Sequence, residues 1–252
     1  MTKPYLPSVH QTWAHSVCDR HTLANILSEQ KVTAIETDIL MGSFHDEIAA
    51  AIVNVSNSNL EERVPIMAHP PSRISNLTPE IFFDMVFGCQ EKAPHIKLDF
   101  KEIETVQSVL SSLMDSYSKH CMDDLNLDEK LCVYLNADVL AGPGMQNESA
   151  KVDAEDFMNI CSEIILKNQT SNLVWAFSLG WRTDPRAYGN GYEDDHVDDM
   201  LDLIKRHSKV TENVGMLFNL INHRQPTNFI VKSYPFHRYR SCSKCSSINK
   251  GF

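Results

Sequence analysis

The chain has 252 residues, of which 42% are hydrophobic and 22% charged, with 9 glycines and 11 prolines. This composition is that of an ordinary globular protein and excludes collagen-like, coiled-coil and wholly disordered chains. No apolar run approaches the roughly 20 residues of a membrane span, and the first residues lack the apolar segment of an export signal. We therefore expect a soluble, cytoplasmic protein without a membrane span, with an extracellular route as the alternative.

Charge is distributed unevenly along the chain. The net charge is -10, but residues 220–252 contain six basic residues and no acidic one, so that residues 1–219 carry -16. An acidic body argues against nucleic acid as a partner, because phosphate binding requires a basic surface. We expect a folded domain over residues 1–219, followed by a divergent basic tail over residues 220–252.

Strand-like and helix-like segments alternate almost from the start. Apolar residues at helical spacing occur between the predicted strands, and Thr78, Pro79 and Asp153 are typical of helix starts. The predicted strands cover residues 13–17, 34–40, 64–68, 95–100, 131–140 and 173–181. This alternation predicts one α/β domain on a parallel sheet. Since no strand precedes a glycine-rich phosphate loop, a TIM-type (β/α) barrel is favoured over a doubly wound sheet.

The predicted barrel is incomplete at its C-terminal end. Six strands are clear, residues 214–221 form a candidate seventh, and the tail offers no amphipathic helix. A parallel barrel without its last βα unit would expose strand edges and part of its interior. We infer a truncated or alternatively spliced terminus.

Four predicted strands carry polar residues on the face that should point into the barrel. Strand side chains alternate between faces, so the apolar set around Leu98 packs on helices while Lys97, Asp99 and Lys101 point inward. The same inversion occurs in the other strands, with Glu36 and Asp38, with Tyr134, Asn136 and Asp138, and with Ser178. These residues lie near the carboxyl ends of the strands, where barrel active sites are found.

The inward acids indicate a metal site. Glu36, Asp38 and Asp99 would repel one another without a cation, and an all-oxygen ligand set suits Mg²⁺, or alternatively Ca²⁺. His15 and His69 follow strands in the same zone. For a single histidine an ordinary hydrogen-bonded role is the better assumption, but the combination points to metal-assisted chemistry on a phosphate ester.

Further inward or neighbouring residues are candidates for substrate binding. Lys97 is such a candidate, and Lys101 is a catalytic candidate beside His15 and His69; both lysines could neutralise charge that develops on a phosphate. The other candidates are Asn136, Asp138, Ser178 and Trp181. Asn136 and Ser178 could equally hydrogen-bond within the barrel, and Trp181 could pack in the core instead of covering a substrate.

Six sequence blocks, in order, resemble the menorin family, and in particular its short, single-domain, B-type members. The blocks are WAHSV at 13–17, ETDIL at 36–40, IMAHPP at 66–71, KLDFK at 97–101, LNADVL at 135–140 followed by GPG at 142–144, and SLGW at 178–181. The family is similar to glycerophosphodiester phosphodiesterase-like barrels, which include the spider-venom type phospholipases D. Its members are associated with neuronal patterning and tissue maintenance rather than with a defined substrate.

The resemblance implies roles for individual residues. His15 matches a histidine that acts as nucleophile or acid/base, and Glu36 with Asp38 matches an E-x-D pair that holds Mg²⁺. By the same resemblance Asp99 is the third ligand and Lys101 a phosphate contact. His69 matches the second histidine less closely, since it follows a later strand.

Two hypotheses follow. The protein is a metal-dependent phosphodiesterase for a glycerophosphodiester or lysophospholipid-like substrate, or it is a non-catalytic factor of neuronal or tissue maintenance that binds a partner, which could be a protein.

Overall fold

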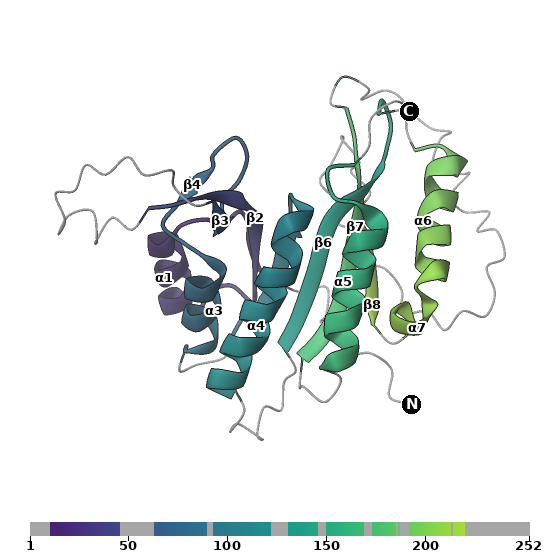
Figure 1. The fold of residues 1–252 in the computed structure, drawn as a ribbon. Coiled ribbons are helices and arrows are strands. Elements are labelled where there is room, and N and C mark those ends of the chain that lie inside the picture. The colour runs from purple at the N-terminus through teal and green to yellow at the C-terminus, as the bar shows by residue number, and fades with distance from the viewer. Residues whose placement is uncertain are drawn as a thin grey trace, which may run out of the picture.

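The computed structural model describes most of residues 11–219 in several stretches. They are 11–45, 63–89, 93–121, 131–145, 150–168, 173–184, 186, 192–212 and 214–219. The basic tail over residues 220–252 lies outside these stretches. Figure 1 shows a curled sheet with helices packed along one of its faces.

The principal sheet is parallel and follows chain order. Its strands are β1 (Trp13–Ala14), β2 (Ala34–Phe44), β5 (His95–Phe100), β6 (Leu131–Ala141), β7 (Leu173–Arg182) and β8 (Gly215–Asn219). Each strand lies beside the next without a reversal of direction, which is the winding of a barrel and not of a doubly wound sheet. Within the described strands β1 and β8 do not pair, so the sheet is a curled half-barrel. The predicted α/β class and parallel sheet are confirmed, while the described residues do not form a closed TIM barrel.

Strand β2 extends beyond its parallel neighbours. Residues 34–39 of β2 pair with β5, and only its first two residues pair with β1. The remaining half is covered by β3 (Val64–Met67), which is antiparallel to β2, and by β4 (Ile74–Ser75), which is parallel to it. The strand expected at residues 64–68 is therefore present, but it does not belong to the parallel series.

The principal helices alternate with the strands along the chain and begin largely where the sequence indicates. They are α1 (Arg20–Glu29), α3 (Pro79–Phe87), α4 (Val106–Cys121), α5 (Ala154–Lys167) and α6 (Asp194–Arg206), with the short segments η1 (Ile103–Thr105) and α7 (Ser208–Thr211). Thr78 caps α3 and Asp153 caps α5, each by accepting a hydrogen bond from a backbone N–H in the first turn. Among the described helices, none has the length and apolarity that a membrane crossing requires.

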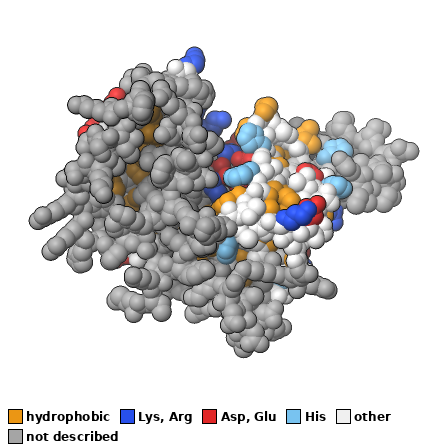
Figure 2. Space-filling view, turned by 180° about the vertical axis from the view of Figure 1, so that it is seen from behind, with side chains coloured by type: hydrophobic (Ala, Val, Ile, Leu, Met, Phe, Trp, Pro, Cys, Tyr) orange, Lys and Arg blue, Asp and Glu red, His pale blue; other side chains and the backbone are white. Residues whose placement is uncertain are grey.

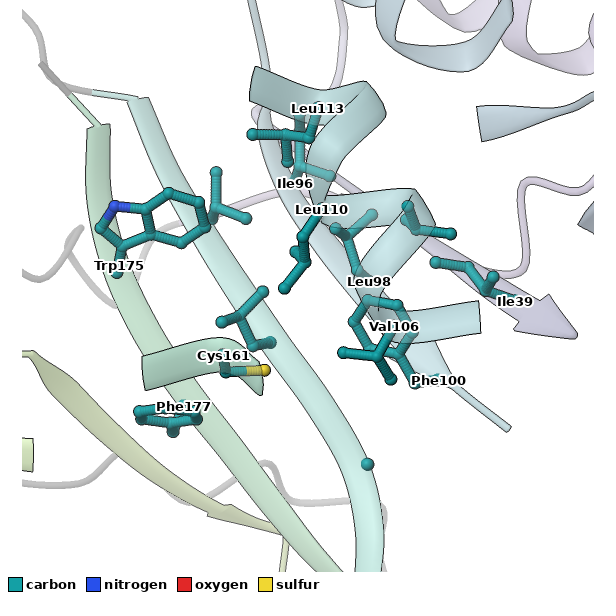
Figure 3. Close-up of a cluster of buried hydrophobic side chains, with 14 of the residues drawn as sticks. Ile39, Ile96, Leu98, Phe100, Val106, Leu110, Leu113, Cys161, Trp175 and Phe177 are labelled. Carbon is teal, nitrogen blue, oxygen red and sulfur yellow. The ribbon is translucent and has the colours of Figure 1, made fainter. Parts of the chain in front are cut away.

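The hydrophobic core fills the space between the helices and one face of the sheet (Figure 3). Alternate residues of β5, such as Ile96 and Leu98, are fully buried there. The rings of Phe100, Phe157 and Phe177 form a chain, with centroid separations of 5.8 and 6.5 Å. Because the apolar set of each strand faces the helices, the alternate set faces the inside of the curl, as predicted.

Candidate functional site

Parallel pairing places the inward polar residues in layers across neighbouring strands. In one layer Glu36 pairs with Lys97, and in the next Asp38 pairs with Asp99. The second layer continues across β6 and β7 through Asn136 and Ser178. On the face opposite to the view of Figure 1, Figure 2 shows acidic and basic side chains gathered in a hollow, with histidines close by.

The first layer is centred on Glu36. Its Oε1 accepts a hydrogen bond from Lys97 Nζ at 2.7 Å, and its Oε2 contacts His15 Nδ1. Burial alone would raise the pKa of Glu36, but the positive charge of Lys97 and the contact with His15 outweigh it and hold this pKa below its ordinary value. Glu36 is therefore a carboxylate at neutral pH.

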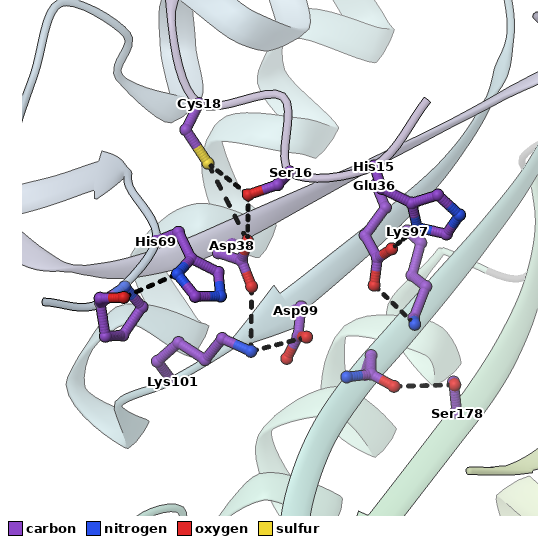
Figure 4. A network of polar contacts seen from close by, with 12 residues as sticks. His15, Ser16, Cys18, Glu36, Asp38, His69, Lys97, Asp99, Lys101 and Ser178 are labelled. Carbon is purple, nitrogen blue, oxygen red and sulfur yellow. Dashed lines mark hydrogen bonds and ion pairs between the residues drawn. The ribbon is translucent and has the colours of Figure 1, made fainter. Parts of the chain in front are cut away.

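The second layer is centred on the ammonium group of Lys101. Its Nζ lies 2.9 Å from Asp38 Oδ1 and 2.7 Å from Asp99 Oδ2, so that one cation joins carboxylates from two strands (Figure 4). Burial raises the pKa of Asp99 despite the opposing effects of Lys101 and Lys97. The two neighbouring carboxylates raise the pKa of Lys101, against the effect of its own burial. Lys101 is therefore charged at any physiological pH.

These contacts change the argument that the acids require a metal. Within the described residues, each of these acids is paired with Lys97 or Lys101, and no three His, Cys, Asp or Glu side chains are grouped as metal ligands. The donor chemistry still fits a hard divalent cation, because Asp38 and Asp99 already share one cationic position and offer only oxygen. Glu36 would complete such a set in competition with its contacts to Lys97 and His15.

The two predicted histidines have different surroundings. His15 follows β1 directly, its side chain is 57% exposed, and its Nδ1 contacts Glu36. His69 follows β3 and is exposed, and its Nδ1 lies 2.6 Å from the carbonyl oxygen of Pro70. Figure 4 draws the His69 ring on the Asp38 side of the network and His15 on the Glu36 side. The structure thus joins His15 to a predicted metal ligand, whereas His69 makes no hydrogen bond or ion pair with one among the described residues.

The predicted substrate-binding residues of β6 and β7 also differ from one another. Ser178 Oγ donates to Asn136 Oδ1 at 2.8 Å, and both residues are buried, so they have the hydrogen bond that was the alternative to substrate binding. The side chain of Asp138 is accessible to water near the end of β6, but the surrounding protein atoms reduce its hydration. This desolvation and the negative charge of Asp99 raise its pKa to about 6.

Trp181 lies among core residues. It is 3% exposed, its Nε1 donates to the carbonyl oxygen of His196 in α6, and its ring lies 5.0 Å from that of Tyr192. These contacts are those of a packing residue on the helix side of the sheet.

The segment after β1 contains functional candidates that sequence reasoning missed. Ser16 Oγ donates to Asp38 Oδ2 at 3.1 Å, and Cys18 Sγ lies 4.0 Å from the same oxygen. Their closeness to His15 in the sequence was a usable signal. They were missed because neither residue is charged and neither follows the alternation of side chains along a strand. Burial raises the pKa of the Cys18 thiol, so it is not an activated nucleophile.

A cavity of about 270 Å³ lies beside this segment. Its lining is mixed polar and apolar, and consists of Cys18, Asp19, His45, Ile74, Ser75 and Asn76. Ile74 is 62% exposed, which is unusual for a large aliphatic side chain. Since Cys18 belongs both to this lining and to the surroundings of Asp38, the cavity adjoins the polar network.

Two arginines and a glutamate hold the second half of β2. Arg63 directly precedes β3, Arg73 directly precedes β4, and Glu102 follows β5. Glu102 accepts hydrogen bonds from Met41 N–H at 2.8 Å and from Arg73 Nη2 at 2.5 Å. Arg73 and Arg63 both donate to the carbonyl oxygen of Met41, at 2.7 and 3.0 Å. These contacts hold the part of β2 that follows Asp38.

A comparison of the sequence with known families gives a match that spans the described strands and the charged layers. The Menorin N-terminal domain matches residues 8–222, which is well over half of the chain and includes every described strand. The match includes both predicted histidines and all the inward acids of the site. The chain therefore belongs to the menorin family.

Proposed function

We propose that this protein is a metal-dependent phosphodiesterase-like protein that acts on a glycerophosphodiester or lysophospholipid-like substrate. The observation that carries the proposal is the single cationic position that Asp38 and Asp99 share at the carboxyl ends of neighbouring parallel strands. Glu36 lies one layer away on the same face of β2. This is the end of a barrel sheet at which catalytic residues are usually found.

The residues of the network have complementary roles in this proposal. Glu36, Asp38 and Asp99 would hold Mg²⁺, which when bound polarises a phosphoryl oxygen. Lys97 and Lys101, whose ammonium groups the ion would displace from these carboxylates, would offset negative charge on the phosphate. His15 is held by Glu36 through Nδ1, so its Nε2 is the nitrogen that attacks phosphorus or transfers a proton. His69 is the second acid/base group.

The substrate class follows from the surroundings of the network. Two lysines and three carboxylates leave a net charge of -1, which a bound Mg²⁺ would turn into +1, the complement of the single negative charge of a phosphodiester. The cavity beside Cys18 offers room for a substituent of the phosphate, and its exposed Ile74 is suited to an apolar part. A lysophospholipid-like or glycerol-containing diester has both parts.

A second function is favoured by one specific observation. Each predicted ligand is already paired with Lys97, Lys101 or His15, and carboxylates paired in this way need no metal to be stable. The same network could bind a phosphate-containing ligand, or stabilise a barrel that binds a protein partner, without turnover. A role in neuronal or tissue maintenance through binding is this alternative.

The two functions are separated by turnover measurements on the full chain. Glycerophosphocholine, glycerophosphoethanolamine and lysophosphatidylcholine are incubated with the protein and Mg²⁺, and the released alcohol or choline is measured. The proposal requires turnover that EDTA abolishes. His15→Asn should reduce it by at least about 100-fold, as loss of a proton-transfer group does, and Glu36→Gln should reduce it because a metal ligand is lost. Lys205→Met, which removes a surface ion pair with Asp202, serves as the control. Binding of these ligands without turnover would support the alternative, and turnover in Glu36→Gln equal to that of the wild type would refute the assigned metal role.

A further inference from the structure

Two non-glycine residues of the described chain have positive φ, and only one of them lies at an ordinary position for it. Gln30, with φ of 51°, is the residue that ends helix α1, where the left-handed conformation is common. Ser16, with φ of 54°, directly follows His15 and caps no helix. A left-handed serine is uncommon, and such strain persists only where the surrounding structure enforces it.

The turn at Ser16 brings two consecutive side chains to the same face of β2. In a regular strand His15 and Ser16 would point to opposite faces. Instead His15 contacts Glu36 and Ser16 contacts Asp38, two residues of β2 that share the inward face. The backbone N–H of Val17 donates to the carbonyl oxygen of Glu36 at 3.0 Å, which anchors the end of the turn on β2.

The contact of Ser16 completes the fixation of Asp38. Ser16 Oγ donates to Oδ2 of Asp38 at 3.1 Å, while Lys101 Nζ lies 2.9 Å from Oδ1. The Asp38 side chain is only 7% exposed, so water contributes little to its orientation. Lys101 thus contacts Oδ1, while Ser16 and, at 4.0 Å, the Cys18 thiol contact Oδ2, and these contacts determine the plane of the carboxylate (Figure 4).

We infer that Ser16 is a positioning residue of the site, whose left-handed backbone directs His15 to Glu36 and whose hydroxyl orients the Asp38 carboxylate. The role rests on the proposed function in so far as it prepares Asp38 to bind a cation. It does not depend on the identity of the substrate. Ser16 acts through Asp38 and is not assigned a step in the reaction.

The test uses variants that separate the backbone from the hydroxyl. Ser16→Gly accepts positive φ more readily than serine but has no hydroxyl, whereas Ser16→Asn tolerates positive φ and supplies an amide donor. Gln30→Gly is the matched control, because it relieves the same backbone strain at the other residue with positive φ, which lies away from the network. Three quantities are measured on the full chain: the melting temperature, the ¹³C resonance of the Asp38 carboxyl group at pH 7, and the affinity for Mn²⁺ by electron paramagnetic resonance.

We expect Ser16→Gly to melt at or above the wild-type temperature, to shift the Asp38 carboxyl resonance, and to bind Mn²⁺ at least about tenfold more weakly, as loss of a hydrogen bond to a charged group implies. Ser16→Asn should restore part of the affinity, and Gln30→Gly should change neither the resonance nor the affinity. An unchanged Asp38 resonance in Ser16→Gly would overturn the positioning role. So would a loss of Mn²⁺ affinity that is accompanied by a lower melting temperature and is explained by it. If the wild type binds no Mn²⁺ and turns over no diester, the proposed function fails, and the resonance of Asp38 alone decides the role of Ser16.

Discussion

Removal of the ammonium group that joins Asp38 and Asp99 should destabilise the protein in a way that a divalent cation reverses. Lys101→Met retains most of the aliphatic side chain but leaves two carboxylates on adjacent strands without their shared positive charge. The Asp38 and Asp99 side chains are 7% and 15% exposed, and that of Lys101 is 27% exposed, so the pairs are largely shielded from water. Breaking a buried pair by removing one partner costs about 3–5 kcal/mol, and we expect about 3 kcal/mol because Lys101 is not fully buried.

This loss can be measured by urea denaturation at pH 7.5. With a urea m value of about 3 kcal/mol/M, a loss of about 3 kcal/mol lowers the midpoint by roughly 1 M while m stays constant. Addition of Mg²⁺ to Lys101→Met should recover a substantial part of the loss, since binding to the native state stabilises it by mass action. The matched control is Lys205→Met, whose surface pair with Asp202 is 60% exposed on each side, and its midpoint should change little.

The refuting results are distinct. A midpoint within about 0.2 M of the wild type, which corresponds to less than about 1 kcal/mol, would show that the shared ammonium group does not hold the two carboxylates together. A large loss that Mg²⁺ leaves unchanged would confirm the ion pairs but contradict the inference that Asp38 and Asp99 can hold a divalent cation.

Three further predictions concern other parts of the site. The pKa of Asp138 is raised to about 6, so its ionisation disfavours the native state. Asp138→Asn should therefore raise the urea midpoint at pH 7.5 and leave it unchanged at pH 3.5, a pH below both the folded and the unfolded pKa of Asp138. A gain at both pH values would contradict this. Glu36 has a lowered pKa, so the stability it contributes is present above its unfolded pKa and is lost as the pH falls through the folded pKa. Glu36→Gln leaves Lys97 without its carboxylate, so its urea midpoint should lie far below that of the wild type at pH 7, and the difference should shrink below about pH 4. A constant difference would exclude the ion pair as its cause. Gly42→Ala places a methyl group 2.5 Å from the carbonyl oxygen of Arg73 and should cost about 1–3 kcal/mol by calorimetry, whereas a neutral result would mean that the β2–β4 contact can separate freely.

The sequence predicts the parallel strands well because each repeats the same strong pattern. Leu98 and its apolar neighbours alternate with Lys97, Asp99 and Lys101, and the structure places the first set in the core and the second on the inward face. Alternation along one strand specifies faces but not register between strands. The pairing of Glu36 with Lys97, and of Asp38 with Asp99, depends on that register and could only be seen in the structure.

Sequence reasoning failed where local geometry departs from the regular strand. It extended β1 through Val17, whereas the strand ends at Ala14 and the chain turns at Ser16 through a conformation that alternation cannot represent. It also gave no indication that the lysines and the acids would pair with each other. Within the protein the two sets bind each other, because a buried carboxylate takes the nearest available cation.

The way β2 is shared between distant parts of the chain determines when the site can form. Glu36 and its partner Lys97 are 61 positions apart in the sequence, whereas β3 and β4, which cover the second half of β2, precede Lys97. During synthesis, β2 can therefore pair with β3 while Glu36 and Asp38 still lack both lysines. Contacts between residues so far apart form slowly, so the ion pairs form only when β5 arrives, and any change that delays β5 leaves Glu36 and Asp38 without their counter-charges.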